Sequence, residues 1–443
     1  MRFVPHDVEI AEDGFDNEND PFQRRDFAER LTNLVKEAKG PLVAVLDAPW
    51  GAGKTVFAKQ WAAMLRHRGA RVVYFDAFEG DHHEDAFIPL AAEIEHALAE
   101  GHTAAVAFRK TAARAFRVIA PKAADVTLKF LMRGALDLAD VQGITRAISE
   151  DAGEAAGGLA AEYFEQRLAS AADEKAAIEN FRAGLAKLAG RGGDGASFPL
   201  VVMIDELDRC RPDFAIRVLE RVKHFFSVEN VVFILIVNLD QLEQAVKGVY
   251  GSSIAARTYI EKFYHLRLRL PKPPPPSQRT HPLQDHVVRL WEQFDIPNRA
   301  HRNQHIDMLV NMAPQLGLEL RTIERILVNY GLYMITADDR HIQEPSIIFG
   351  ICTMRHLDPP LYERAASGRI TLAEVDAFFA WAGQDTPNWA RDVWSWAVGP
   401  EEIARRIETS SERISSAFAF MDRGKVVPHL CSILESLHPP KTA

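Results

Sequence analysis

Residues 48–55, APWGAGKT, have the residue types of a phosphate-binding loop. Gly51 and Gly53 let backbone amides approach phosphate oxygens, because no side chain intervenes. Lys54 would span the β- and γ-phosphates of a nucleoside triphosphate, and Thr55 would offer its hydroxyl to Mg²⁺. An apolar run before the motif and the helical pattern VFAKQWAAML after it supply the strand–loop–helix context that the motif requires. The segment therefore predicts a site for ATP with magnesium.

The loop departs from the pattern G-x-x-x-x-G-K-[ST] at its first position, which is Ala48. Alanine is compatible with the loop only where its φ is negative, so we expect residue 48 to end a strand with that geometry. A glycine-rich turn without a ligand is the alternative reading. The remaining nucleotide-contacting candidates of the loop are Pro49, Trp50, Ala52 and Val56.

A second motif, the strand LVVMIDELDR at 200–209 with its acidic end, would complete the site. Its apolar strand ends in Asp205 and Glu206, which would emerge at the carboxyl edge of a parallel sheet, where ligands bind. Asp205 would hold magnesium through water, and Glu206 could accept a proton from an attacking water. Acidic residues after a strand also begin ordinary solvated loops, but the phosphate-binding loop earlier in the chain favours the functional interpretation, in which Glu206 indicates hydrolysis.

The elements needed to position these motifs alternate along the chain. Short apolar runs separated by helical stretches predict a parallel α/β sheet with strands at 41–47, 71–77, 199–205, 231–237 and 264–270. Residues from about 100 to 195 are alanine-rich, have no strong strand pattern, and predict a helical insertion. Consecutive prolines predict a stiff linker. The expected division is an acidic arm at 1–20, a nucleotide-binding domain at 21–270, a linker at 271–279 and a helical region at 280–443.

Composition narrows the class of protein. The chain has 443 residues and a net charge of -9, which argues against a protein that coats nucleic acid over its whole surface. Its three widely spaced cysteines predict neither a zinc site nor a disulfide framework. The acidic N-terminus does not resemble a targeting peptide, and no apolar run reaches the roughly 20 residues of a membrane helix. We therefore expect a cytoplasmic protein.

Longer segments carry a family resemblance. The run IDELDRCRPDF, the motif WGAGKT, and the segments VVYFDAFEGDHHEDAF, YIEKFYHLRLRLP and LELRTIERILVNY resemble the KAP family of P-loop NTPases, of the STAND class. The resemblance covers most of residues 20–335. It implies a P-loop sheet of the additional-strand type, in which strand 231–237 lies between the phosphate-loop strand and the acidic strand.

The resemblance also implies further nucleotide contacts. Asn238 or Asp240 would lie beside the γ-phosphate as a polar sensor, and Phe22 and Arg24 would contact the adenine base. Arg209, Arg211 and Arg321 are candidates to neutralise charge on the transferred phosphoryl group. A structural ion pair is the alternative for each arginine.

One segment departs from many KAP proteins, which carry membrane-spanning helices between the two motifs. Here the corresponding residues 108–134 are interrupted by basic residues every few positions and could not span a bilayer. They could form a helical lid, lie on an anionic membrane surface or contact nucleic acid. His82 and His83 invite a metal assignment, but adjacent histidines point apart, which disfavours it.

Two functions remain in competition. The first is a magnesium-dependent ATPase whose hydrolysis rearranges the helical region. The second is a nucleotide-gated module that self-associates or recruits an effector protein with negligible turnover. The resemblance suggests a role in bacteriophage defence, with a membrane-linked signalling scaffold as the alternative.

Overall fold

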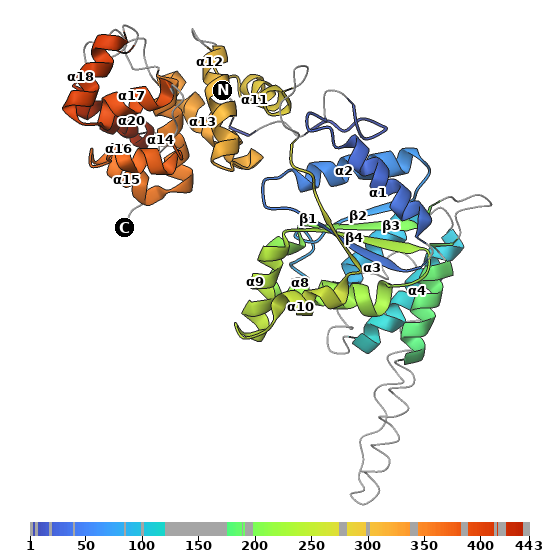
Figure 1. Cartoon of the computed structure of the whole chain (residues 1–443). Coiled ribbons are helices and arrows are strands. Elements are labelled where there is room, and N and C mark those ends of the chain that lie inside the picture. Colours follow the sequence, from blue (N-terminus) through green and yellow to red (C-terminus); the bar gives the residue numbers. More distant parts are fainter. Residues whose placement is uncertain are drawn as a thin grey trace, which may run out of the picture.

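The computed structural model (Figure 1) describes residues 3–4, 8–16, 20–38, 40–83, 86–98, 102–119, 175–187, 189–190, 198–273, 281–297, 302–336, 344–381, 389–411, 414 and 422–436. Its centre is a five-stranded parallel sheet with the order β2-β3-β4-β1-β5. The strands are β1 (Leu42–Asp47), β2 (Val72–Asp76), β3 (Leu200–Asp205), β4 (Val231–Val237) and β5 (Leu266–Arg269). Because β4 lies between β1 and β3, the additional-strand arrangement is confirmed.

The register of the sheet brings the two chemical motifs to one edge. In the β1–β4 pair Asp47 lies opposite Val237, and in the β3–β4 pair Asp205 lies opposite Ile236. All strands are parallel, so their carboxyl ends share an edge. The loop after β1 and the acidic residues at the end of β3 therefore lie one strand apart.

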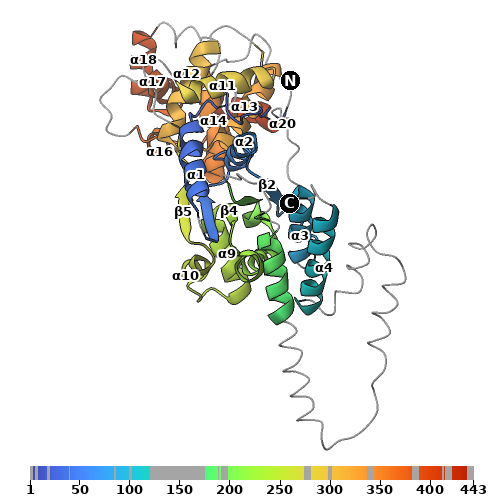
Figure 2. The ribbon, with the colours of Figure 1, turned by 90° about the vertical axis from the view of Figure 1, so that its right-hand side faces the viewer.

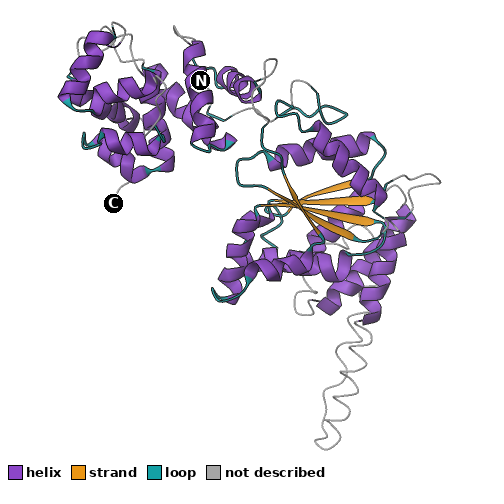
Figure 3. Cartoon of the chain, viewed as in Figure 1, coloured by secondary structure: helices purple, strands orange, loops and turns teal. Residues whose placement is uncertain are grey.

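The sheet is buried on both faces, which explains its uninterrupted apolar runs. Alternate residues of β1 enter different cores: Val43 and Val45 pack on one face, and Ala44 and Leu46 pack on the other. Helices α1 (Arg25–Glu37) and α2 (Lys54–His67) cover the second face. The first face is covered by α3 (Phe87–Leu98), α4 (His102–Ile119), α8 (Pro212–Arg221), α9 (Leu239–Tyr250) and α10 (Ala256–Ile260) (Figures 1 and 3). Short turns η1 (Leu207–Arg209), η2 (Val222–Phe226) and η3 (Glu261–Phe263) connect these elements.

The predicted insertion is helical where the structure describes it. Its two described ends, α4 and residues 175–187, lie side by side, with the rings of Phe108 and Phe181 5.5 Å apart. The part of the basic segment at 108–119 belongs to α4. Residues 120–134, on which the lid, membrane-surface and nucleic-acid alternatives also depend, lie outside the described residues.

The C-terminal region forms a separate helical core. Over the described ranges, its helices are α11 (Pro282–Gln293), α12 (Arg302–Gln315), α13 (Leu320–Thr336), α14 (Pro345–Leu357), α15 (Pro359–Ala366), α16 (Leu372–Phe378), α17 (Trp389–Val398), α18 (Glu401–Ser410) and α20 (Arg423–Ser436). The tryptophans Trp381, Trp394 and Trp396 are buried in this core. Figure 1 shows α11 and α13 on the side of the region that lies toward α2, and in Figure 2 the helices of this region lie above the sheet. Within the described residues, no helix has the length and apolarity that a bilayer crossing requires.

Candidate nucleotide site

A cavity of about 410 Å³ opens where the carboxyl edge of the sheet meets the helical region. Its walls come from four parts of the chain that are distant in sequence. They are the N-terminal arm and the start of α1, the phosphate-binding loop, the end of β3 with η1, and helices α11 and α13. The volume is within the range of small-molecule sites, and the position at the strand ends is typical of ligand sites in open α/β sheets.

The phosphate-binding loop has the backbone that its glycines allow. Gly51 and Gly53 have φ values of 85° and 80°, in the left-handed region, whereas the φ of Ala48 is not positive. Ala48 directly follows β1, so the expectation for this position is confirmed. The buried Lys54 Nζ donates to the carbonyl oxygens of Ala48 at 2.7 Å and Pro49 at 3.2 Å. Burial lowers the pKa of Lys54, so its ammonium is a desolvated cation within reach of the cavity.

Asp205 is almost completely buried at the end of β3, and its two oxygens have separate partners. The Tyr74 hydroxyl donates to Oδ2 at 2.6 Å, and the backbone N–H of Glu206 donates to Oδ1 at 2.8 Å. Burial raises the pKa of Asp205, which the hydrogen bonds from Tyr74 and Thr55 oppose. The Thr55 hydroxyl also lies 3.5 Å from Glu206 Oε1. These hard oxygen donors fit Mg²⁺, which binds through one or two protein oxygens together with phosphate and water.

Glu206 is held in an unusual backbone conformation. Its φ of 60° and ψ of 20° lie in the left-handed region, which costs free energy for a residue other than glycine. Its carboxylate forms an ion pair with Arg209 at 2.7 Å. Burial raises the pKa of Glu206, and Arg209 acts in the opposite direction. The left-handed residue marks the point where the chain leaves β3, beside the cavity.

The residues before α1 connect the phosphate-binding loop to the linker. The buried Arg24 guanidinium lies 5.1 Å from the centre of the Phe22 ring and donates to Ala52 O at 3.0 Å and Pro271 O at 3.2 Å. Burial lowers the pKa of Arg24 to about 10. Both Phe22 and Arg24 line the cavity, as do Trp50, Gly51, Gly53, Lys54, Thr55 and Val56.

The helical region contacts the loop closely at the start of α13. A Cβ atom placed on Gly51 would lie 2.8 Å from the Cβ of Arg321, and one on Gly53 would lie 3.8 Å from Leu320 Cδ1. Arg321 therefore lies against the phosphate-binding loop. The same wall contains His286 and Arg289 of α11, which were not singled out in the sequence because no motif surrounds them.

Several predicted site residues lie outside the cavity wall. Arg211 is held by Asp81 and by the carbonyl of His83, with its backbone N–H 2.7 Å from Asp81 Oδ2. The Asn238 side chain caps α9 by accepting from the N–H groups of Asp240 and Gln241. Arg209 lines the cavity but is paired with Glu206. The roles proposed for these residues toward a nucleotide stay predictions.

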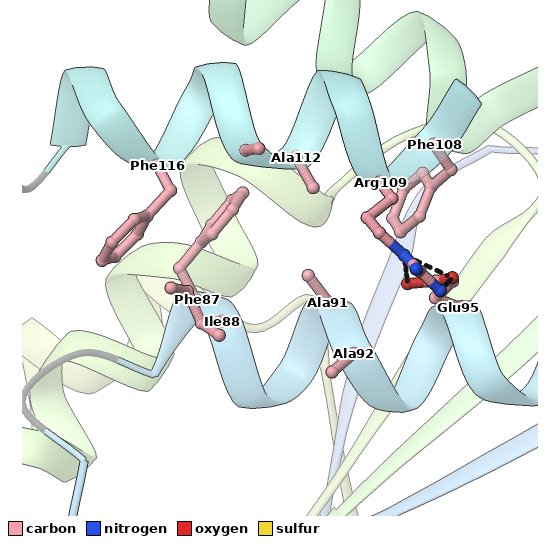
Figure 4. Close-up of a pocket in the computed structure, with 10 residues that line it drawn as sticks. Phe87, Ile88, Ala91, Ala92, Glu95, Phe108, Arg109, Ala112 and Phe116 are labelled. Carbon is pink, nitrogen blue, oxygen red and sulfur yellow. Dashed lines mark hydrogen bonds and ion pairs between the residues drawn. The ribbon is translucent and has the colours of Figure 1, made fainter. Parts of the chain in front are cut away.

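A second, much smaller cavity lies between α3 and α4 (Figure 4). Its volume of about 10 Å³ is at the lower limit for one water molecule. Arg109 Nε donates to the two carboxylate oxygens of Glu95 at 3.0 and 3.1 Å at one end of the cavity, and the rings of Phe87 and Phe116 line the other end. This feature is helix packing at the base of the insertion. Among the described residues, His82 and His83 belong to no cluster of three metal-binding side chains.

A glycine-rich loop between a parallel strand and a helix, an acidic strand end across the cavity, and an intervening strand together define a P-loop NTPase fold and site. A profile of the KAP family P-loop domain matches residues 24–332. The chain therefore belongs to the KAP family, and nucleotide binding is the general property that this membership supports. No curated protein sequence matches it. A solved structure, "Structure of the Aeropyrum Pernix ORC2 protein (ADPNP-ADP complexes)", is similar over 97% of this chain and 98% of that one, with 12% identity and a TM-score of 0.34.

Proposed function

We propose that this protein binds ATP with Mg²⁺ and hydrolyses it at the cavity between the sheet and the helical region. The observation that carries the proposal is the position of the acidic strand end, since Thr55 of the phosphate-binding loop lies 3.5 Å from Glu206 and shares its cavity with Asp205. A carboxylate at this place can act on an attacking water. Glycine-rich loops that only bind a phosphate do not require it.

Each residue of the site would have a separate role in an in-line displacement at the γ-phosphate. Lys54 leaves its two carbonyl partners and binds the β- and γ-phosphates, while the amides of the loop hold the phosphate oxygens. Thr55 and Asp205 would hold magnesium, which supplies positive charge to the phosphate oxygens when bound. Glu206 accepts a proton from water as the water oxygen bonds to the γ-phosphorus and the bond to the β–γ bridging oxygen breaks. Arg209 must first release Glu206, because a paired carboxylate is a weaker base.

Hydrolysis would act on the rest of the chain through α13. Arg321 lies against the phosphate-binding loop at Gly51, so loss of the γ-phosphate would change the surface on which the helical region rests. The proposed output is a conformational or assembly switch, with self-association or an effector protein as its readout. Such coupling requires that the nucleotide bind the two arrangements with different affinities.

Phosphate release in magnesium-containing buffer tests the proposal with matched variants. Glu206→Gln should keep ATP binding and lose about 10²- to 10⁴-fold in rate, the usual contribution of a general base. Lys54→Ala should lose both binding and turnover, whereas Lys59→Ala, an exposed residue on the same helix, should match wild type. Equal rates in all four proteins would reject hydrolysis at this site.

The Glu206–Arg209 ion pair favours a second candidate function. In that reading the pair persists with ATP bound, turnover is negligible, and nucleotide occupancy alone gates assembly. Mass measurements with ATP and with a non-hydrolysable analogue distinguish the two. Assembly that is equal in both, without phosphate release from ATP, supports the gated module.

For the biological role we propose defence against bacteriophage by a cytoplasmic protein, on the basis of the family resemblance. Plating efficiency of phages on cells with wild-type protein and with Lys54→Ala tests it. A protective effect that requires Lys54 supports the role, and plating that does not depend on the protein contradicts it for the phages used.

A further inference from the structure

His286 occupies an unusual position for a histidine on an amphipathic helix. It lies on α11, is partly buried, and forms part of the wall of the nucleotide cavity together with Arg289, Leu290 and Gln293. Its ring centre is 5.2 Å from that of Phe22, and the rings are tilted by 58°. Among the residues that the structure describes, its buried Nε2 atom has no hydrogen-bond partner. A helix of the C-terminal region thus places an unsatisfied polar atom at a cavity whose other walls include the phosphate-binding loop.

An unpartnered buried nitrogen requires an explanation, because buried polar atoms in folded proteins nearly always have partners. Leaving it unpaired costs free energy, which a ligand atom that reaches Nε2 would recover. The His286 ring lines the cavity beside Phe22, and Arg289 and Arg24 are its charged neighbours, so a ligand in the cavity is the candidate partner. The same arginine contacts the phosphate-binding loop at Ala52 O, so His286 is two side chains away from the loop.

Burial and the charges around the ring determine the protonation state of the imidazole. Burial and the guanidinium groups of Arg289 and Arg24 lower the pKa of His286 to about 4, so the imidazole is neutral at pH 7. A neutral imidazole has one donor nitrogen and one acceptor nitrogen. In the tautomer protonated at Nδ1, the unpartnered Nε2 is the acceptor and needs an N–H or O–H donor from the ligand.

We propose that His286 is a base-specificity residue, which accepts a hydrogen bond from the 6-amino group of adenine and discriminates against guanine. Adenine has an amino donor at this position, and guanine has a carbonyl acceptor whose lone pairs would face that of Nε2. The Phe22 ring packs on the base beside it. This inference rests on the proposed nucleotide site and adds to it a base preference set by the helical region rather than by the phosphate-binding loop.

The consequence is that one nucleotide joins both halves of the molecule. Its phosphates lie on the loop after β1, and its base lies on α11, beyond the proline-rich linker. A guanine nucleotide would bind the loop but leave Nε2 unpaired. Discrimination by a buried polar group of this kind is larger than discrimination by shape, because the wrong base leaves that group without a partner.

The test is a titration of the full-length protein with fluorescent ATP and GTP derivatives in Mg²⁺, with His286→Phe and His281→Phe as paired variants. Wild type should prefer ATP by about tenfold or more, and His286→Phe should reduce that ratio toward one by weakening ATP alone. His281 begins the same helix and does not line the cavity, so His281→Phe should keep the wild-type ratio. Competition by inosine triphosphate, which has a 6-oxo group, should be as weak as that by GTP in wild type, and this measurement does not depend on how a variant folds.

The outcomes separate this inference from the proposed function. Tight binding of both nucleotides, with the same ATP-to-GTP ratio in wild type and His286→Phe, overturns the role of His286 and leaves the nucleotide site intact. Competition by inosine triphosphate that equals competition by ATP overturns the role as well. Absence of binding by any nucleotide to the wild-type protein rejects the site itself. Selective binding of ATP without phosphate release supports the role of His286 and rejects only the proposed hydrolysis.

Discussion

The two sides of the nucleotide cavity are built in different ways. On the sheet side, the loop after β1 and the acidic end of β3 are held by parallel strand ladders, which fix position through the backbone. On the helical side, His286 and Arg321 come from α11 and α13, which reach the site through side-chain packing after a linker. A ladder tolerates surface substitution, whereas a packed contact depends on the shape of each side chain. We therefore infer that the sheet side provides a fixed platform and that any movement between the two sides would involve the packed contacts of the helical side.

The largest test of this difference is a single added methyl group. In Gly51→Ala the new Cβ would lie 2.8 Å from Arg321 Cβ, and the residue has a φ of 85°. We expect ATP affinity to fall by at least about tenfold and the melting temperature to fall, because strain and a clash with α13 act together. Fluorescent nucleotide titration and thermal melting measure the two effects.

Gly69→Ala is the matched control for backbone strain. Its φ is 84°, and within the described part of the chain no heavy atom lies within 4 Å of a Cβ placed there. We expect it to cost about 1–2 kcal/mol of stability, the usual cost of the left-handed conformation, without a change in ATP affinity. If both variants lost the same stability and neither lost affinity, the contact between α13 and the loop would have no role in binding.

Much of the sheet side could be predicted from the sequence. Uninterrupted apolar runs bounded by glycine and proline indicate buried parallel strands, and the five observed strands lie within the five predicted ranges. Parallel pairing then requires Asp205 and the phosphate-binding loop to share an edge. The left-handed backbone of Glu206 could not be predicted, because it depends on how the chain turns into η1 after β3.

The partners of individual polar residues could not be predicted either. Arg211 bonds to Asp81, which is 130 positions away in the chain, and the Asn238 side chain caps its own helix. His286 has no motif around it, and its significance comes from tertiary packing beside Phe22. Spacing along a helix indicates which face is buried but not which cavity that face reaches.

The stability of the helical side is expected to depend on pH through His286. The pKa of His286 is lowered from 6.5 to about 4, so below pH 6.5 the unfolded chain binds a proton that the folded chain does not. This contribution to stability is fully present above pH 6.5 and is lost as the pH falls toward 4. We expect a loss of up to about 3 kcal/mol over that window.

Denaturant unfolding of wild type and His286→Phe between pH 7 and pH 4 measures this contribution. Fluorescence of the buried Trp291, on the same helix, reports on this region. The Phe variant should have a smaller acid-induced loss than wild type, because it has no imidazole to protonate. Parallel pH curves for the two proteins would contradict the assigned state of His286.

The smallest effect is expected on the sheet side, at the ion pair between Glu29 of α1 and Arg68 at the end of α2. The hydrogen bond from Arg68 lowers the pKa of Glu29, so the pair stabilises the fold above the ordinary value of 4.5 and is lost as the pH falls through the lower, folded value. Both side chains are about one-third exposed, so we expect less than about 1 kcal/mol. Glu29→Gln should remove this part of the acid dependence and leave nucleotide affinity unchanged.

The comparison with His286 is then direct, because a surface ion pair on the sheet side should alter stability slightly and nucleotide binding not at all. A change in ATP affinity in Glu29→Gln would mean that α1 and α2 are not the fixed platform inferred from the ladders.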